Sequence, residues 1–318
     1  MKTIKKLSFV IGTLVALVAI AQPVSASKWD VNGDGSVTSV DITVIYNYLL
    51  NGNLEFPESS YDVNKDGYIT SVDITEIYNA LLNGMPNSTT EYTVNGVTFV
   101  MVNVKGGTFT MGNPNYQSDE DYYDEGPVHQ VTVSSFSIGQ TEVTQELWYA
   151  VMGWNYSGHE GNLQYPVEYV NYEMCQNFIA KLNEMTGLNF RLPTEAEWEF
   201  AARGGNKSQG YLYSGSNNID DVAWYKNNSG NETHVVATKA PNELGIYDMS
   251  GNVWEWCSDW YADYSAGAQV NPTGPETGGE KVMRGGSWYG KDKKCRISER
   301  FKASTLFGDD DIGLRLAM

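Results

Sequence analysis

The stretch VMRGGSWYGKDKKCRISERFKASTLFGDDDIGLRLAM, residues 282–318, decides the fold of the larger part of this chain. Its adjacent glycines, Gly285 and Gly286, let the backbone turn, or approach a neighbour more closely than a β-carbon would permit. A single cysteine, Cys295, follows, and residues 312–316 have the pattern of a closing strand. The stretch therefore predicts a tight turn before Cys295 and a final strand after it.

Two upstream segments also have sequence patterns that predict local structure. Residues 191–205, RLPTEAEWEFAARGG, predict a helix, because Thr194 and Glu197 form a capping box and a glycine pair ends the segment. Residues 245–256, GIYDMSGNVWEW, predict a tight turn that carries two carboxylates. Apolar periodicity further predicts strands over residues 99–104, 128–133 and 136–138, and helices over residues 144–152 and 171–186.

In this order, the three segments resemble the formylglycine-generating enzyme family, also called sulfatase-modifying factors. Members of that family end in a GGS(W/Y) turn, two reactive cysteines five residues apart and a GFRxA-type strand. The resemblance covers residues 93–318, which we expect to form one domain. It implies an α+β fold of the C-type-lectin-like kind, with little regular secondary structure.

The resemblance also places the candidate catalytic residues. The second family cysteine corresponds to Cys295, the first to Gly290, and Ser287 takes the position that lines the family's oxygen pocket. The family binds copper(I) between two thiolates and uses O₂ to oxidise a substrate cysteine, and copper(I) favours such thiolate pairs. Because Gly290 supplies no ligand, we expect a non-oxidising binding or accessory module. The alternative is a copper-dependent formylglycine-generating oxidase that uses Cys295 and Ser287.

The segment between the turn and the closing strand is the expected binding surface. We predict that residues 288–311 are exposed and contact a glycan or a protein through Trp288, Tyr289 and Phe301. Three lysines crowd this segment; they could lower the pKa of Cys295 or simply belong to a solvated hairpin. The three histidines, His129, His159 and His234, are scattered and show no metal-ligand spacing.

A structural calcium ion is implied at the tight turn of residues 245–256. The family binds calcium at positions that match the carboxylates of Asp248 and Glu255 and the carbonyls of Gly251 and Val253. The alternative is an acidic turn held by backbone hydrogen bonds.

A tandem repeat lies upstream of this domain, where DVNGDGSVTSVD (residues 30–41) is matched by DVNKDGYITSVD (residues 62–73). Oxygen donors at loop positions 1, 3, 5, 9 and 12, a glycine at position 6 and a carbonyl at position 7 are the ligand pattern of calcium. We therefore expect one calcium ion in each loop. The predicted ligands are Asp30, Asn32, Asp34, Ser36, Thr38 and Asp41, and then Asp62, Asn64, Asp66, Tyr68, Thr70 and Asp73.

Each loop is followed by one helix, predicted over residues 42–50 and 74–82 and ended by Asn-Gly. An ordinary EF-hand has a helix before each loop as well, so this half-motif looks like a dockerin, over residues 27–84. Dockerins bind cohesin domains, and their recognition positions correspond to Ser39, Val40, Ser71 and Val72. The alternative is a calcium-stabilised spacer without a partner. Residues 85–92 are predicted as the linker.

The remaining signals concern the compartment. Residues 1–26 have the charged start, apolar run and small-residue cleavage site of a secretory signal peptide, and the run is short for a membrane anchor. We expect an exported protein, attached to a cell surface or assembly through the dockerin-like module, with no transmembrane segment after cleavage.

Composition excludes other classes of function. A net charge of −18 argues against nucleic acid, whose phosphates would be repelled. Much of this charge lies in residues 119–125 and 309–311, which we expect to be solvated. Of the three cysteines at least one is unpaired, and Cys257 could pair with Cys295.

Overall fold

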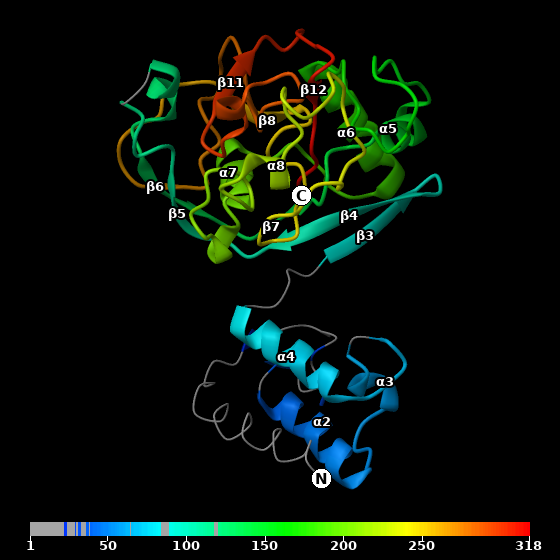
Figure 1. Ribbon diagram of the computed structural model, residues 1–318. Helices are drawn as coiled ribbons and strands as arrows, with labels where there is room; N and C mark the ends of the chain where they lie inside the picture. The colour runs from blue at the N-terminus through cyan, green and yellow to red at the C-terminus, as the bar shows by residue number, and fades with distance from the viewer. Residues whose placement is uncertain are drawn as a thin grey trace. The chain divides into compact units, whose positions relative to one another are not determined.

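A computed structural model describes residues 22–23, 29, 31–32, 36–37, 39–63, 65–83, 89–117 and 120–318 (Figure 1). Its internal contacts divide the chain into two compact units, residues 1–86 and 87–318. Most of the predicted signal peptide and residues 85–88 of the predicted linker lie outside the described residues, as do Asp30, Asp34, Thr38 and Asn64 of the predicted calcium loops. Residues 89–92 of the predicted linker instead belong to a strand. No helix among the described residues is long and apolar enough to span a membrane.

The first unit is built on two similar helices, one after each repeat. They begin three residues earlier than predicted, since Ser39 and Ser71 already lie in the first turn, where the following aspartates favour the helix N-terminus. A short helix before the second loop was not predicted. The described elements are β1 (Gln22–Pro23), β2 (Ser36–Val37), α2 (Ser39–Asn51), α3 (Glu58–Tyr61) and α4 (Ser71–Asn83), and β1 pairs antiparallel with β2. Their small core consists of Val31, Ile42, Ile45, Tyr61, Val63 and Ile77.

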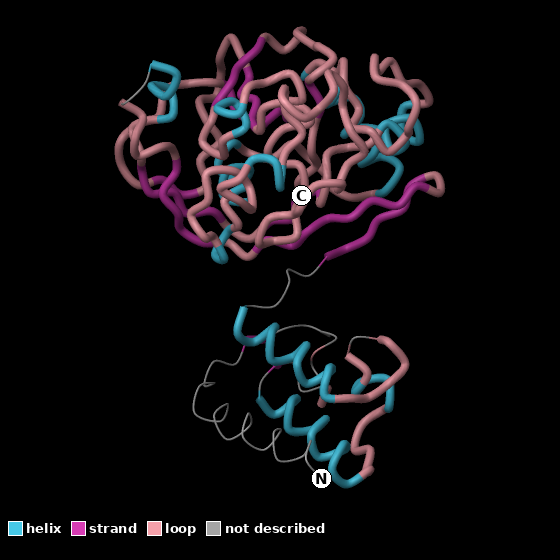
Figure 2. Tube along the Cα trace, in the orientation of Figure 1, coloured by secondary structure: helices cyan, strands magenta, loops and turns pink. Residues whose placement is uncertain are grey.

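The second unit is dominated by loops, with three small sheets among them (Figure 2). One has the strand order β11-β10-β8-β12, the second β3-β4-β7 and the third β5-β6-β9. The strands are β3 (Thr89–Val94), β4 (Val97–Val104), β5 (Gly107–Met111), β6 (His129–Val133), β7 (Phe136–Gly139), β8 (Trp254–Trp260), β9 (Gln269–Val270), β10 (Lys281–Arg284), β11 (Arg300–Ala303) and β12 (Ile312–Gly313). The predicted strands are confirmed as β4, β6 and β7.

The helices of this unit begin where the local sequence predicts. Thr144, Asn171 and Thr194 each accept a hydrogen bond from a backbone amide of the first turn, and Thr194 forms the full capping box with Glu197. The helices are α5 (Gln145–Met152), α6 (Tyr172–Thr186), α7 (Glu195–Ala202) and the short α8 (Ile219–Val222), with 3₁₀ turns η1 (Glu120–Glu125), η2 (Gly205–Lys207) and η3 (Asp292–Cys295). An α+β fold is thereby confirmed.

Residues 314–318 tie distant parts of the second unit together. The amides of Gly139 and Val143 donate to the carbonyls of Leu316 and Leu314, at 2.8 and 2.9 Å. Ala317 bridges both Ile138 and Arg191. The closing segment predicted from the sequence therefore runs along β7 and on to the residues before α7, although only Ile312–Gly313 forms a regular strand, β12.

Buried arginine–carboxylate pairs join the elements of this unit. Arg284 pairs with Glu199, Arg300 with Glu195, and Arg315 with Glu255. A fourth pair corrects an expectation, because Glu125 of the acidic loop is fully buried against Arg296 rather than solvated. Removing one member of such a pair leaves an unpaired buried charge, so these contacts fix which segments lie together.

Candidate functional site

The glycine pair after β10 allows an unusually close backbone approach. Gly285 and Gly286 have φ values of +99° and +76°, which side-chain-bearing residues rarely adopt. A β-carbon at Gly286 would lie 2.4 Å from the Lys294 carbonyl oxygen and 2.9 Å from the Cys295 sulfur. The turn can therefore carry residues 287–290 directly past Cys295 only because both positions are glycine.

Ser287 and Trp288, the two residues after the turn, are held in place by hydrogen bonds. Ser287 Oγ donates to Asp311 Oδ2 at 2.7 Å, while the backbone amide of Trp288 donates to the Asn252 carbonyl at 2.8 Å. The indole of Trp288 donates to the Asp310 carbonyl and packs edge-on against His159. Trp288 is only 6% exposed. The expectation that Trp288 is exposed is therefore wrong. Its side chain is buried, with its indole N–H bonded to the Asp310 carbonyl and its ring packed against His159.

Cys295 lies in an apolar cluster and not at a charged surface. Its side chain is fully buried among Tyr213, Ile219, Val222, Ala223 and Tyr225. Burial, followed by the charge of Glu299, raises the pKa of the Cys295 thiol to about 12. The neighbouring lysines do not lower this pKa, and Lys294 instead pairs with Glu299. At neutral pH this cysteine is a thiol and not a thiolate.

The three cysteines are too dispersed to act together. All are free and buried, so the disulfide considered between Cys257 and Cys295 does not form. Cys175 lies in the core around α5 and α6, Cys257 in a second core around α7, and Cys295 in the tyrosine cluster. Burial raises the pKa of each thiol. The chain thus offers no second sulfur beside Cys295.

Gly290 occupies the position of the missing family cysteine. Its amide donates to the Ser287 carbonyl, and its own carbonyl accepts from the Lys226 amide, both at 3.0 Å. A β-carbon here would lie 3.3 Å from the Ser287 carbonyl oxygen and 3.4 Å from Lys294 Cβ. A side chain at this position is therefore tight but requires neighbouring atoms to move by only a few tenths of an ångström.

The outer face of residues 288–311 carries exposed aromatic and apolar side chains. Tyr289 is 58% exposed and lies beneath the Lys226 ammonium, which is 4.5 Å from the ring centre. Phe301 is 43% exposed and stacks on Trp254 at 5.2 Å. Leu306 and Phe307 are exposed as well. We call these four exposed side chains of residues 288–311 the aromatic face; it contains the predicted ligand contacts Tyr289 and Phe301.

The turn of residues 245–256 is acidic and deeply buried, but its carboxylates are unequal. Asp248 Oδ2 accepts from the Ala237 amide, whereas its buried Oδ1 has no hydrogen-bond partner among the described residues. Both oxygens of Glu255 accept from Arg315, and Oε2 also accepts from the Trp198 indole. Glu255 is thus already neutralised, while Asp248 remains available to a cation.

Sequence reasoning missed one residue at this turn, Glu142. Its buried carboxylate accepts from the Asn252 side chain at 2.8 Å and from the Val253 amide at 3.2 Å. Burial first, and then the charges of Asp248 and Glu255, raise its pKa well above the usual range. No local signal marks Glu142, because it precedes the turn by more than a hundred residues.

Among described residues no three His, Cys, Asp or Glu side chains converge as a metal cluster, so calcium at this turn stays a prediction.

The second repeat loop folds around its own carboxylates. Asp62 accepts from the amides of Asp66 and Gly67, and Asp66 accepts from that of Tyr68. The fully buried Asp73 accepts from Val63 and Thr70, both at 2.8 Å. Asp62, Asp66 and Asp73 are among the described residues that do not converge as a metal cluster, so calcium in this loop stays a prediction.

The first loop repeats this arrangement where it is described. Asp41 is fully buried and accepts from the amides of Val31 and Asn32. The predicted partner-binding positions fall at equivalent places in the first turns of α2 and α4, where Val40 and Val72 are both about half exposed. Two apolar side chains thus stand outward at related positions.

Comparison with known proteins identifies both units. The protein-family model of the sulfatase-modifying factor enzyme 1-like domain matches residues 89–318. The chain belongs to the sulfatase-modifying-factor family. The dockerin type I domain matches residues 28–82, so the predicted dockerin module is confirmed. Dockerin modules generally bind calcium and cohesins and are typical of extracellular proteins.

Relatives of this family member differ in their described roles. The chaperone protein LppX of Paenibacillus barcinonensis is 37% identical, over 68% of this chain and 88% of that protein. The formylglycine-generating enzyme of Streptomyces coelicolor is also 37% identical, but over 40% of this chain and 46% of that enzyme. Among solved structures, Treponema denticola variable protein 1 superposes with a TM-score of 0.66 at 35% identity, covering 72% of this chain and 98% of that one. These neighbours confirm the C-type-lectin-like fold.

Proposed function

We propose that this protein is an exported, dockerin-bearing binding module whose sulfatase-modifying-factor domain recognises a ligand and does not oxidise a cysteine. One observation carries the proposal: Cys295 is a buried thiol within an apolar cluster, and Gly290 stands at the position of its missing partner. The copper ion of the parent reaction is held by two thiolates. Here Gly290 lacks sulfur, and burial favours the protonated form of the Cys295 thiol.

The aromatic face supports a binding role. A glycan or protein ligand would contact Tyr289 and Phe301, whose rings are exposed yet fixed by Lys226 and Trp254. Exposed aromatic side chains that are held in place lose little conformational entropy when a partner binds, which is why such residues dominate recognition surfaces. Lys226 adds a positive charge to this face in a chain that is otherwise strongly acidic.

The dockerin module gives the binding domain a means of attachment. We propose that calcium occupies both repeat loops and that Ser39, Val40, Ser71 and Val72 contact a cohesin. Val40 and Val72 are exposed at equivalent positions of α2 and α4, which supports an interface formed by either helix. The proposed export signal, residues 1–26, would place the protein where such assemblies form.

The test is an oxidation assay on the calcium-loaded full chain. A peptide containing Cys-x-Pro-x-Arg is incubated with copper(I) and O₂, and conversion of its thiol to an aldehyde is measured by mass spectrometry. Wild type should give no conversion above a protein-free control. Conversion by wild type, lost in Cys295→Ala, would overturn the proposal and establish the oxidase.

A matched variant separates a lost activity from a wrong site. Gly290→Cys restores the second thiol at a position where the β-carbon needs only a small adjustment. If Gly290→Cys converts the peptide and Gly290→Cys/Cys295→Ala does not, the natural protein is a non-oxidising member that retains the family's geometry. The folded state of both variants is checked by near-ultraviolet circular dichroism.

A further inference from the structure

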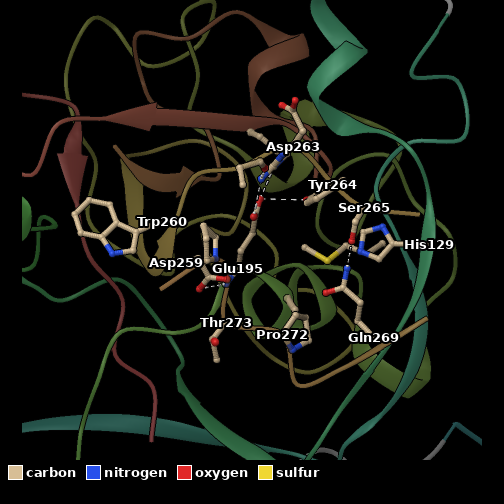
Figure 3. A pocket seen from close by; sticks show the side chains of 16 residues that line it. His129, Glu195, Asp259, Trp260, Asp263, Tyr264, Ser265, Gln269, Pro272 and Thr273 are labelled. Carbon is tan, nitrogen blue, oxygen red and sulfur yellow. Dashed lines mark hydrogen bonds and ion pairs between the residues drawn. The ribbon is translucent and has the colours of Figure 1, made fainter. Parts of the chain in front are cut away.

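Away from the aromatic face, the domain has two adjoining cavities that no family feature assigns. The first, of about 260 Å³, lies beside β8 and is lined by His129, Glu195, Asp259, Trp260 and Tyr264 (Figure 3). The second, of about 460 Å³, is lined by Tyr172, Gln176, Ser258 and Asn271 among others. Pro272 and Thr273 line both, so the two cavities share this loop as a wall.

The charged groups of these cavities, apart from the exposed Asp263, are largely paired with protein partners. The Glu195 carboxylate accepts two hydrogen bonds from Arg300, at 2.6 and 2.9 Å, and one from the Tyr264 hydroxyl. In the second cavity Arg191 forms a two-pronged ion pair with Glu197, at 2.6 and 2.7 Å. A charged ligand would have to compete with these pairs, and it would lose its own hydration on entry.

The uncommitted polar atoms are instead suited to hydroxyl groups. Asp259 Oδ2 accepts from the Glu195 amide and the Ser258 hydroxyl, whereas Oδ1 has no hydrogen bond to any described residue. His129 Nδ1 lies 3.0 Å from the Pro127 carbonyl, which can only accept, so Nδ1 carries the proton and Nε2 is left as an acceptor. A hydroxyl group both donates and accepts, so it can pair with Asp259 Oδ1 whether or not that carboxyl holds a proton, and it can donate to His129 Nε2.

Rigid aromatic rings stand in the wall of each cavity. The Lys281 ammonium lies 4.0 Å from the ring centre of Trp260 and 4.7 Å from that of Tyr172. It also donates to the Ser258 carbonyl, and its side chain is almost fully buried. Lys281 thus fixes one ring of the first cavity and one of the second. The bound cation also makes these rings poor sites for a second cation.

We propose that the two cavities form one binding groove for a neutral oligosaccharide. Sugar hydroxyls form hydrogen bonds with Asp259 and donate to His129, and the apolar faces of the sugar rings pack on Trp260 and Tyr172. Sites for small ligands typically have volumes of roughly 300–1,000 Å³ with a few convergent polar groups, and the adjoining cavities together fall in this range. The hydroxyl and amide groups of the second cavity continue the same uncharged chemistry.

The experiment is isothermal titration of the calcium-loaded full chain with defined hexasaccharides. The neutral probes are the β-1,4-linked hexamers of glucose, xylose, mannose and N-acetylglucosamine. Deacetylation of the last hexamer gives a matched cationic probe, and hexagalacturonate is the anionic probe. At least one neutral hexamer should bind, and the charged probes should bind at least tenfold more weakly. Absence of binding by every neutral probe up to millimolar concentration, or tighter binding of a charged one, overturns the proposal.

Variants decide whether the groove is the site. Trp260→Ala and Asp259→Asn should each weaken binding at least tenfold, since one removes a ring and the other changes the hydrogen-bonding group at the Oδ1 position while keeping the shape. Tyr149→Ala removes an exposed aromatic ring on α5 and should leave affinity unchanged. If Phe301→Ala abolishes binding and the groove variants do not, the sugar binds the aromatic face, and the groove assignment is wrong. Melting temperatures identify any variant that fails to fold.

Discussion

Replacing Asp259 by asparagine is expected to change how the stability of the protein depends on pH. Burial, followed by the nearby charge of Glu195, raises the pKa of Asp259 from 3.8 to about 7. In the unfolded chain this carboxyl titrates near its ordinary value of about 4. Between the two values the folded protein holds a proton that the unfolded chain has released. The stability contributed by this proton is full below about pH 4 and is lost as pH rises through 7.

The size of the effect follows from the difference in pKa. One unit corresponds to about 1.4 kcal/mol, so a difference of about three units amounts to about 4 kcal/mol, of which about 3 kcal/mol falls between pH 5 and pH 8. Asparagine has no titrating proton, yet its amide oxygen still accepts from Glu195 and Ser258. The free energy of unfolding of Asp259→Asn, minus that of wild type, should therefore increase by about 3 kcal/mol over this range.

The assay is urea unfolding of the calcium-loaded chain at pH 5, 6, 7 and 8, followed by tryptophan fluorescence. Asp263→Asn, which removes an exposed carboxylate from the same cavity wall, is the control for the loss of a surface charge. A difference between Asp259→Asn and wild type that stays constant to within about 1 kcal/mol across the range would refute a buried, protonated Asp259. The absolute offset between the two proteins has no bearing on this outcome.

Three further predictions concern other parts of the chain. Arg315→Met should lower the free energy of unfolding by about 3–5 kcal/mol, because Glu255 is left charged and buried, and adding Glu255→Gln should recover part of this loss in the same urea assay. Cys295→Ala should cost only about 1 kcal/mol, from the loss of a buried sulfur, and should leave ligand affinity at the aromatic face unchanged within twofold; a larger change in titration calorimetry contradicts a purely packing role. Asp73→Asn should weaken calcium binding to the second loop at least tenfold in chelator titrations and reduce helical circular dichroism at low calcium, and an unchanged affinity would exclude Asp73 as a ligand.

Local chemistry explains which features the sequence could predict. The capping box of Thr194 and Glu197 needs only residues within one turn, and it appears in the structure as expected. The repeat loops are also local, since in each loop the described aspartates accept hydrogen bonds from backbone amides of the same repeat. Such features were predictable because residues close in sequence decide them.

Features of the candidate site that depend on chain closure could not be predicted. Trp288 was predicted to be exposed with the rest of residues 288–311, but its amide donates to the carbonyl of Asn252 and its ring packs against His159, both from other segments. The lysines next to Cys295 left open a lowered pKa or a solvated hairpin, whereas burial in the tyrosine cluster of residues 213–225 raises the pKa of this thiol. In each case a distant segment decided the environment. The sequence pattern carries no information on which segment that is.

The hydrogen bonds of residues 314–318 have a consequence for how the chain emerges during synthesis. Arg315 donates to the carbonyl of Gly139, a residue 176 positions earlier, and the neighbouring amides along β7 find partners in the same late segment. At typical translation rates the ribosome synthesises residues 314–318 on the order of ten seconds after the residues of β7 to which they are hydrogen-bonded. The helices α2 and α4, whose partners are close in sequence, have no such delay. In the nascent sulfatase-modifying-factor domain, β7 can therefore form its hydrogen bonds to residues 314–318 only after the last residues of the domain are made.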